Sequence, residues 1–199
     1  RIYLIPTILG ENTQSKTLPP YTINTIKNIN IFIVENIRTA RRQIKKIDKT
    51  RDINKITFYA YGKHHKLNLE EDLLKHILNG IDVGILSEAG MPCIADPGSI
   101  IVSYAHDMQI NITPLTGPSS IPLALMTSGL NGQNFAFNGY LPIEKNDRKK
   151  TIKELEKKAQ QKNQTQIFME TPFRNNQLFQ TLIKICKGDT KLCVATNIT

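Results

Sequence analysis

Short runs of aliphatic and β-branched residues alternate along this chain with amphipathic stretches of helical period, and this alternation constrains the fold more than any other feature. It is typical of α/β proteins, in which crossover helices join parallel strands. The strands that we expect first are Ile2–Ile5, Ile31–Glu35, Lys55–Ala60, Val83–Ser87 and Asn111–Leu115. The helices expected between them are Thr22–Ile29, Ile37–Ile47, Leu69–Leu78 and Pro97–Met108. The pattern predicts a mostly parallel five-stranded sheet with helices on both faces, and ligands outside the carboxyl ends of its strands.

The pattern changes after Gly117, so we expect a domain boundary near residue 116, with an N-terminal α/β domain at 1–116 and a C-terminal α/β domain at 117–199. A length of 199 residues suits two small domains as well as one of medium size. The second domain is expected to hold a mixed sheet with helices. Its expected elements are a helix at Ser119–Ser128, a strand at Phe135–Tyr140, a helix at Asp147–Lys162, a strand at Gln166–Glu170, a helix at Asn175–Cys186 and a strand at Lys191–Ala195. The chain has no initiator Met and stops within an apolar run, so we expect a trimmed version of a longer protein.

The composition is basic, with 26 Lys and Arg against 17 Asp and Glu and a net charge of +9. Either an anionic partner or an AT-rich coding sequence accounts for this excess. A hydrophobic fraction of 40% is enough to bury a core, and no apolar run approaches the ~20 residues that cross a bilayer. The three cysteines form no C-x-x-C pair, which favours a reducing, cytoplasmic compartment and gives no sign of a metal site.

Three segments that follow expected strands could hold a ligand. Ser87-Glu88-Ala89-Gly90 follows a buried-looking strand; Gly90 permits close approach of the backbone, and Glu88 could accept hydrogen bonds from ribose hydroxyls. Asp96 and Pro97 then suit a helix start, with Asp as the N-cap. Thr116–Ile121 opens a helix with two hydroxyls, which suits a carboxylate or ribose as well as an ordinary Ser cap. In Ile167–Asn175, Phe168 and Met169 could wall an adenine, while Glu170 and Arg174 could pair with each other or with substrate.

Cationic residues follow one side of the expected helix Ile37–Ile47, opposite an apolar face formed by Ile37, Ala40, Ile44 and Ile47. These cations are Arg38, Arg41, Arg42, Lys45, Lys46 and Lys49. Such a stripe can follow a phosphate backbone, although a charged stripe is also the usual solvated face of a helix. A second basic cluster, Arg148-Lys149-Lys150, is diluted by Glu154 and Glu156.

Other common sites are absent from the sequence. It contains no G-x-x-x-x-G-K-[ST] loop, and no G-x-G-x-x-G follows the first strand, which argues against an ordinary nucleotide hydrolase or dinucleotide enzyme. His64 and His65 lie in a basic loop after a strand, where one of them could serve as a general base.

Eight short motifs, taken in order, resemble the tetrapyrrole methylase superfamily, and within it most closely the bacterial small-subunit ribosomal RNA (cytidine-2′-O)-methyltransferases. They are Leu4-Ile5-Pro6-Thr7-Ile8-Leu9-Gly10, Glu35-Asn36-Ile37-Arg38-Thr39, Leu86-Ser87-Glu88-Ala89-Gly90-Met91-Pro92, Ile94-Ala95-Asp96-Pro97-Gly98, Gly117-Pro118-Ser119-Ser120, Ser128-Gly129-Leu130, Phe137-Asn138-Gly139-Tyr140-Leu141-Pro142 and Glu170-Thr171-Pro172-Phe173-Arg174.

The resemblance implies an S-adenosylmethionine-dependent methyltransferase of two α/β domains, with the cofactor in the cleft between them, and a homodimer. The cofactor-binding residues that it implies are Pro6, Leu9, Ser87, Glu88, Ala89, Gly90, Ser119, Ser120, Ile121, Phe168 and Met169. The substrate implied is a ribose 2′-hydroxyl of small-subunit ribosomal RNA, a weak nucleophile that needs a base or a hydrogen-bonding partner. The candidates for that role are Glu35, His64 and Glu170, and those for RNA binding are Arg38, Arg41, Arg42, Lys45 and Arg174.

The chain departs from the ribosomal RNA enzymes at a few positions. They usually carry Asp where this chain has Asn36 and Glu88, and their Ala-Arg-Glu-Leu-Thr run is here Ala195-Thr196-Asn197-Ile198-Thr199. Two alternatives therefore stay open. One is a C-methyltransferase for a carboxylate-rich tetrapyrrole, and the other is a ribosome- or RNA-associated protein that keeps the fold without catalysis.

Overall fold

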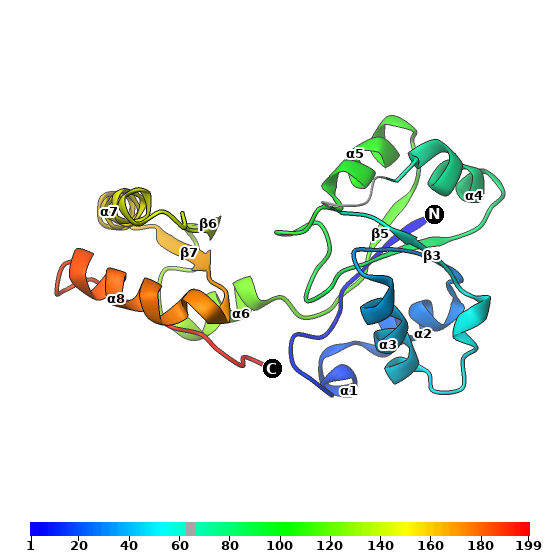
Figure 1. Cartoon of the computed structure of the whole chain (residues 1–199), viewed down its shortest axis with the longest axis horizontal. Helices are drawn as coiled ribbons and strands as arrows, with labels where there is room; N and C mark the ends of the chain where they lie inside the picture. The colour runs from blue at the N-terminus through cyan, green and yellow to red at the C-terminus, as the bar shows by residue number, and fades with distance from the viewer. Residues whose placement is uncertain (63–66) are drawn as a thin grey trace. The chain divides into compact units, whose positions relative to one another are not determined.

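The computed structural model describes residues 1–62 and 67–199, and these divide into two compact units (Figure 1). The first unit comprises residues 1–120 together with Thr199, and the second comprises 121–198. None of the helices in the described ranges is both long and apolar enough to span a membrane.

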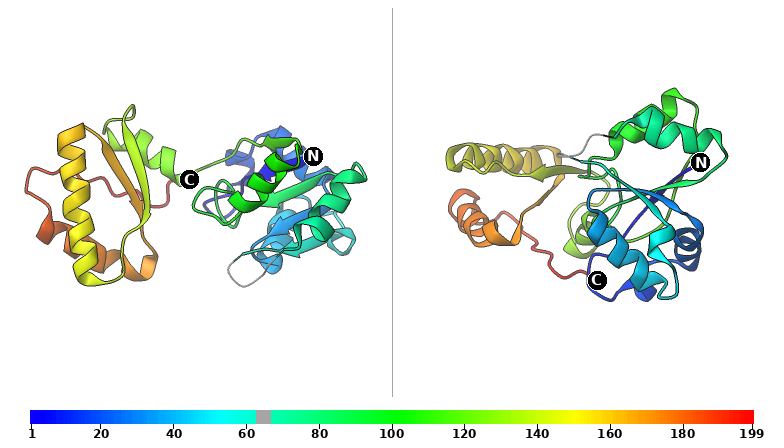
Figure 2. Two further views of the ribbon diagram at one scale, coloured as in Figure 1. Left: turned by 90° about the horizontal axis from the view of Figure 1, so that it is seen from above. Right: turned by 45° about the vertical axis from the view of Figure 1, so that its right-hand side comes forward.

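A five-stranded parallel sheet forms the centre of the first unit (Figure 2). The strand order is β3-β2-β4-β1-β5, which places the first strand between the fourth and the fifth. The strands are β1 (Ile2–Ile5), β2 (Ile31–Val34), β3 (Thr57–Ala60), β4 (Val83–Leu86) and β5 (Ile112–Pro114). The sequence-based prediction of a parallel five-stranded sheet is confirmed.

The composition of the two central strands, β2 and β4, fits a parallel sheet that is covered on both faces. Ile-Phe-Ile-Val in β2 and Val-Gly-Ile-Leu in β4 are buried at every position, as strands packed on both faces must be. Gly84 has no room for a side chain, because a Cβ there would lie 2.6 Å from Cδ1 of Ile5 and 3.1 Å from Cδ1 of Phe32. The glycine thus lets neighbouring strands pack large side chains over it.

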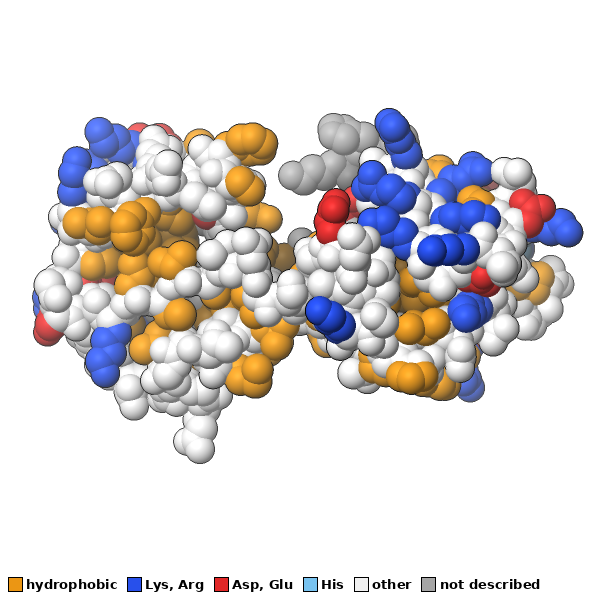
Figure 3. Space-filling model, turned by 90° about the horizontal axis from the view of Figure 1, so that it is seen from below, with side chains coloured by type: hydrophobic (Ala, Val, Ile, Leu, Met, Phe, Trp, Pro, Cys, Tyr) orange, Lys and Arg blue, Asp and Glu red, His pale blue; other side chains and the backbone are white. Residues whose placement is uncertain are grey.

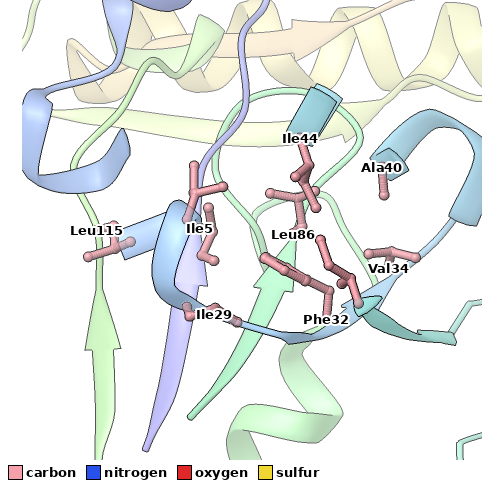
Figure 4. Close-up of a cluster of buried hydrophobic side chains, with 10 residues drawn as sticks. Ile5, Ile29, Phe32, Val34, Ala40, Ile44, Leu86 and Leu115 are labelled. Atoms are coloured by element: carbon pink, nitrogen blue, oxygen red, sulfur yellow. The ribbon is translucent and has the colours of Figure 1, made fainter. Parts of the chain in front are cut away.

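Two hydrophobic clusters lie on the two faces of the sheet. Figure 4 shows the first, in which Phe32, Leu86 and Ile5 of the strands face Ala40 and Ile44 of α3 (Ile37–Ile47), with residues of α2 (Pro20–Asn28) beside them. The second cluster joins the other face to Leu73, Ile101 and Ala105. The remaining helical elements of this unit are α1 (Gln14–Thr17), η1 (Ile53–Lys55), η2 (Leu69–Leu74), α4 (Lys75–Leu78) and α5 (Ser99–Asp107).

Helix α3 has the bounds that the sequence predicts, because its periodic apolar face and its cap agree. The side-chain oxygen of Asn36 accepts a hydrogen bond from the backbone N–H of Thr39 at 3.1 Å. The helix expected at Leu69–Leu78 is instead a π-helical segment, η2, followed by the single turn α4. Helix α5 starts at Ser99 rather than at Pro97.

The second unit pairs two parallel strands and covers them with helices. Its core is formed by Leu141, Ile152, Leu155, Leu178 and Leu182, with Phe168 packed against them. The elements are α6 (Ser120–Ser128), β6 (Phe135–Tyr140), α7 (Lys145–Lys162), β7 (Thr165–Met169), η3 (Pro172–Arg174) and α8 (Asn175–Ile185).

Two expectations for the second unit need correction. The sheet is a parallel pair, β6–β7, where a mixed sheet was expected. Lys191–Ala195 is not a strand: all five residues are exposed, and no strand of the described residues pairs with them. An apolar, β-prone sequence forms a strand only when a free sheet edge lies beside it.

Candidate functional site

Three segments that are far apart in the sequence meet beyond the carboxyl ends of β1 and β4. Thr7, just after β1, forms an antiparallel bridge with Gly90, through backbone hydrogen bonds of 2.9 and 3.2 Å. Gly117 packs against Pro6, since a Cβ on Gly117 would lie 2.3 Å from Cγ of the proline. A Cβ on Gly90 would lie 3.3 Å from Cδ2 of Leu9 and 3.6 Å from the carbonyl oxygen of Pro118. The structure therefore brings together the turn after β1, the loop that ends at Gly90 and the segment at Gly117 and Pro118.

The loop Ser87-Glu88-Ala89-Gly90 is held by its own hydrogen bonds. The buried hydroxyl of Ser87 donates to the carbonyl oxygen of Gly90 at 2.5 Å and lies 3.4 Å from the hydroxyl of Thr7. Gly90 has a φ of +74°, a conformation that glycine adopts without strain. Ser87 therefore shapes the loop, while Glu88 and Ala89 project from it with partial or full exposure.

A pair of carboxylates, Glu35 and Asp96, lies beside this loop. Glu35 follows β2 directly and Glu88 follows the neighbouring strand β4, in which Leu86 is paired with Val34. Asp96 is fixed, because one of its carboxylate oxygens accepts hydrogen bonds from the backbone N–H groups of Cys93 (3.2 Å) and Gly98 (3.0 Å). The carboxylate of Asp96 lies close enough to that of Glu35 for its charge and hydrogen bonding to raise the pKa of Glu35.

Glu35 has a raised pKa. Burial raises its pKa to about 7, with further contributions from the charge and hydrogen bond of Asp96 and from the charge of Glu88. A carboxyl group that titrates near neutral pH can exchange a proton with a bound hydroxyl.

Glu88 is anchored on the side of α3. Burial raises its pKa, while a hydrogen bond from Thr39 and the charge of Arg42 act in the opposite direction. Its backbone carbonyl accepts a hydrogen bond from the side-chain amide of Gln43 at 3.0 Å. The other end of that amide, Oε1, is buried and has no hydrogen-bond partner among the described residues. Helix α3, which carries the cationic stripe, thus also contacts the Ser87–Gly90 loop.

No cation of α3 forms an ion pair with an acidic side chain of the described residues. Its cations are exposed, and those with hydrogen bonds donate to neutral groups: Arg41 to Oδ1 of Asn54 at 2.8 Å, and Lys45 to the carbonyl oxygen of Arg51 at 2.9 Å. The two ion pairs found within residues 1–62 and 67–199 lie elsewhere. Figure 3 shows Lys and Arg side chains gathered on one face of the first unit. The stripe predicted from the sequence, Arg38, Arg41, Arg42, Lys45, Lys46 and Lys49, therefore presents its positive charge to solvent.

The remaining candidates belong to the second unit or to undescribed residues. Arg174 binds Glu170 through Nε at 2.8 Å and Nη2 at 2.7 Å, so these two side chains pair with each other. Burial would raise the pKa of Glu170, but the N–H of Thr171 and the guanidinium of Arg174 outweigh it and lower that pKa. Phe168 and Met169 are half-buried at the end of β7, and Ile121 is half-buried in α6. His64 lies outside the described residues.

Sequence reasoning missed three residues of this region. Asp96 was expected to cap a helix, but its carboxylate caps the loop amides of Cys93 and Gly98 and meets Glu35. Thr39 and Gln43 of α3 contact Glu88. These two residues are four positions apart, so they lie on the same side of the helix, one turn from each other. That spacing, next to a strand end that carries Glu35, is the signal that could have identified them.

Comparison with known proteins gives the family. A model of the tetrapyrrole (corrin/porphyrin) methylases matches residues 18–199. The chain is 30% identical over 198 residues to the ribosomal RNA small subunit methyltransferase I of Bacillus subtilis (strain 168), covering all of this chain and 63% of that protein. It is 27% identical over 201 residues to the protein of the same name from Vibrio cholerae, covering all of this chain and 65% of that one. The chain thus spans a little under two thirds of the length of these relatives.

The chain also matches a solved structure, the crystal structure of a conserved hypothetical protein from Aeropyrum pernix K1. The match has 14% sequence identity and a TM-score of 0.48, and it covers 71% of this chain and 47% of the other; it adds nothing to the assignment. The family model covers nearly the whole chain, from α2 in the first unit to the end of the second. The chain therefore belongs to the family of tetrapyrrole (corrin/porphyrin) methylases.

Proposed function

We propose that this protein is an S-adenosylmethionine-dependent methyltransferase that methylates a ribose 2′-hydroxyl of small-subunit ribosomal RNA. The observation that carries the proposal is similarity along the whole chain to proteins named ribosomal RNA small subunit methyltransferase I. The proposal includes a cytoplasmic location and a homodimer, as the family resemblance implies.

The joined segments of the first unit suit the cofactor chemically. Gly90 leaves its backbone open to a ligand, the carboxylate of Glu88 can accept hydrogen bonds from ribose hydroxyls, and Ser119 and Ser120 lie at the start of α6. When bound, the cofactor supplies an electrophilic methyl group. The residues that would hold it are Pro6, Leu9, Ser87, Glu88, Ala89, Gly90, Ser119 and Ser120 of the first unit and Ile121, Phe168 and Met169 of the second.

Methylation of a hydroxyl group releases its proton, and the Glu35–Asp96 pair provides an acceptor. Two backbone N–H groups hold the carboxylate of Asp96 in place beside Glu35. Glu35, whose pKa of about 7 leaves part of it ionised at neutral pH, takes the proton of the ribose hydroxyl on a carboxylate oxygen. Glu170 is less suited to this role, since Arg174 occupies its carboxylate.

The cations of α3 would hold the phosphate backbone of the RNA. Each phosphate contact releases counterions, so binding through Arg38, Arg41, Arg42 and Lys45 is expected to weaken steeply with salt. A carboxylate-rich tetrapyrrole would also be attracted to this face. A carbon acceptor, however, places less demand on a base with a pKa near 7, and this favours the RNA substrate.

The test is methylation of purified small ribosomal subunits in the presence of labelled S-adenosylmethionine, with the modified ribose located by mass spectrometry. We expect methylation by the wild-type protein and at least a tenfold loss of rate with Glu35→Gln, which keeps the shape but accepts no proton. Thermal melting with S-adenosylhomocysteine tests the cofactor separately, and a missing shift at saturating ligand would refute it. Methylation of a tetrapyrrole but not of RNA would support the alternative substrate. Cofactor binding without methylation of either would support a protein that keeps the fold without catalysis.

A further inference from the structure

The second unit contains a buried positive charge that forms no ion pair with any described residue. Arg148, in the first turn of α7, is 1% exposed and is the largest of the fully buried side chains. No ion pair of the described residues involves it. Burying a guanidinium group away from water is unfavourable unless an anion or several hydrogen bonds compensate it.

The hydrogen bonds of Arg148 leave one edge of its guanidinium group free. Nη1 donates to the carbonyl oxygen of Ile143 at 3.3 Å and to Oε1 of Gln177 at 3.5 Å, both long contacts. Nε is buried without any partner, and Nη2 takes part in no hydrogen bond of the described residues. Nε and Nη2 form the edge that binds two oxygens of a phosphate or carboxylate group side by side.

Two carboxylates of the second unit, those of Glu144 and Glu170, are already bound to other donors. Glu144 accepts hydrogen bonds from the backbone N–H groups of Asn146 (2.7 Å) and Asp147 (2.8 Å), as the cap of α7. Glu170 is taken by Arg174. Asp147 precedes Arg148 directly on the helix, where adjacent side chains point in different directions. The charge of Glu144 still acts on Arg148, but no carboxylate of the described residues accepts a hydrogen bond from the free edge.

The surroundings favour a phosphate group as the missing anion. The first turns of α7 also carry Lys145, Lys149 and Lys150, so the local potential is positive. Nη2 has no partner among the described residues but, unlike Nε, is not fully enclosed, so this end of the guanidinium group reaches solvent. The contact of Nη1 with Gln177 is at the limit of a hydrogen bond, so it compensates little of the buried charge.

We propose that the Nε/Nη2 edge of Arg148 binds a phosphate group, and that in function this phosphate belongs to the RNA substrate. The second half of this inference rests on the proposed function. It gives the RNA a contact in the second unit in addition to the cationic face of α3 in the first. It also gives the Arg148-Lys149-Lys150 cluster a role that its mixed composition does not suggest.

Nuclear magnetic resonance of the ¹⁵N-labelled wild-type chain tests the phosphate site directly. A buried Nε–H exchanges slowly with water and gives its own signal, which can be assigned through the side-chain correlations of Arg148. We expect inorganic phosphate to shift this signal saturably, and sodium chloride of equal ionic strength to leave it unmoved. An unmoved signal at high phosphate concentration would overturn the site.

A short single-stranded RNA distinguishes the two sources of phosphate. We expect it to shift the same signal, and Arg148→Lys, which keeps the charge but loses the fork, to weaken RNA binding about tenfold and to lower its salt slope by about one. Lys157→Met, at an exposed position of the same helix, is the control and should change affinity less than twofold. RNA that binds without moving the Arg148 signal would overturn the RNA assignment. A protein that binds phosphate at Arg148 but no RNA would keep the site and refute the RNA partner of the proposed function.

Discussion

Replacing Asp96 by Asn tests whether the carboxylate pair controls the protonation of Glu35. The substitution keeps an oxygen that can accept from the backbone N–H groups of Cys93 and Gly98, so the loop should retain its conformation. It removes the negative charge that keeps the proton on Glu35. The amide group can also donate a hydrogen bond to the ionised form of Glu35, which acts in the same direction.

The size of the effect follows from the causes of the raised pKa. Burial, the largest cause of the rise from 4.5 to about 7, remains in Asp96→Asn, while the charge and hydrogen bond of Asp96, the next two causes, are lost. We expect the titration midpoint of Glu35 to fall by about one pH unit, which corresponds to about 1.4 kcal/mol in favour of the ionised form. Glu88→Gln is the matched control, because the charge of Glu88 is the smallest of the causes.

Two measurements follow this shift. Carboxyl ¹³C chemical shifts give the midpoint of Glu35 in the wild-type protein and in both variants. In the proposed reaction the ionised form is active, so the wild-type rate should rise with pH through about 7 and level off above it. In Asp96→Asn the rising limb should move to lower pH by the same amount. A midpoint that stays in place, or a rate limb that moves without it, would refute the reasoning.

Three further sets of substitutions test other parts of the first unit. Gly90→Ala forces a side chain into a φ of +74° and within 3.3 Å of Leu9; we expect a loss of about 1–2 kcal/mol in the free energy of unfolding and weaker binding of S-adenosylhomocysteine, read by melting and calorimetry. Asn36→Ala removes the cap on Thr39 and should cost about 1 kcal/mol by chemical denaturation, whereas Asn36→Ser should restore most of it. The third change replaces three cations of α3, Arg41, Arg42 and Lys45, by Glu. It should abolish salt-dependent RNA binding in filter assays while the melting temperature changes little, and unchanged affinity would rule out this face as the RNA contact.

The parts of the fold that the sequence predicts well are those in which several local signals agree. Helix α3 has a periodic apolar face, a capping Asn36 and cations opposite, and its bounds are correct to the residue. The central strands are apolar throughout because they are covered on both faces. Their position along the chain is therefore clear, although they lack the alternating pattern of a half-buried strand. The segments that follow them come together as expected, because parallel strands end at the same edge of the sheet.

The remaining features depend on contacts that local patterns do not encode. Lys191–Ala195 has the composition of a strand but stays exposed, since it pairs with no strand of the described residues. The Asp-Pro-Gly sequence at Asp96 reads as a helix start, yet the backbone turns so that Cys93 and Ala95 have positive φ and the carboxylate binds the loop instead. The burial of Arg148 is equally hidden, because the surrounding lysines make it resemble one more solvated cation.

The departure at Asn36 is consistent with the electrostatics of the carboxylate pair. An N-cap needs only a hydrogen-bond acceptor, and the amide oxygen of Asn36 provides one to Thr39 without a charge. The neighbouring Glu35 already faces the charges of Asp96 and Glu88, and both raise its pKa. A further negative charge one residue away would raise that pKa again and leave less of the ionised form at neutral pH. The longer side chain of Glu88, in turn, reaches a hydrogen bond with Thr39 that helps to keep it ionised. Both departures from the usual Asp therefore fit a site in which Glu35 accepts the proton, rather than one that has lost its chemistry.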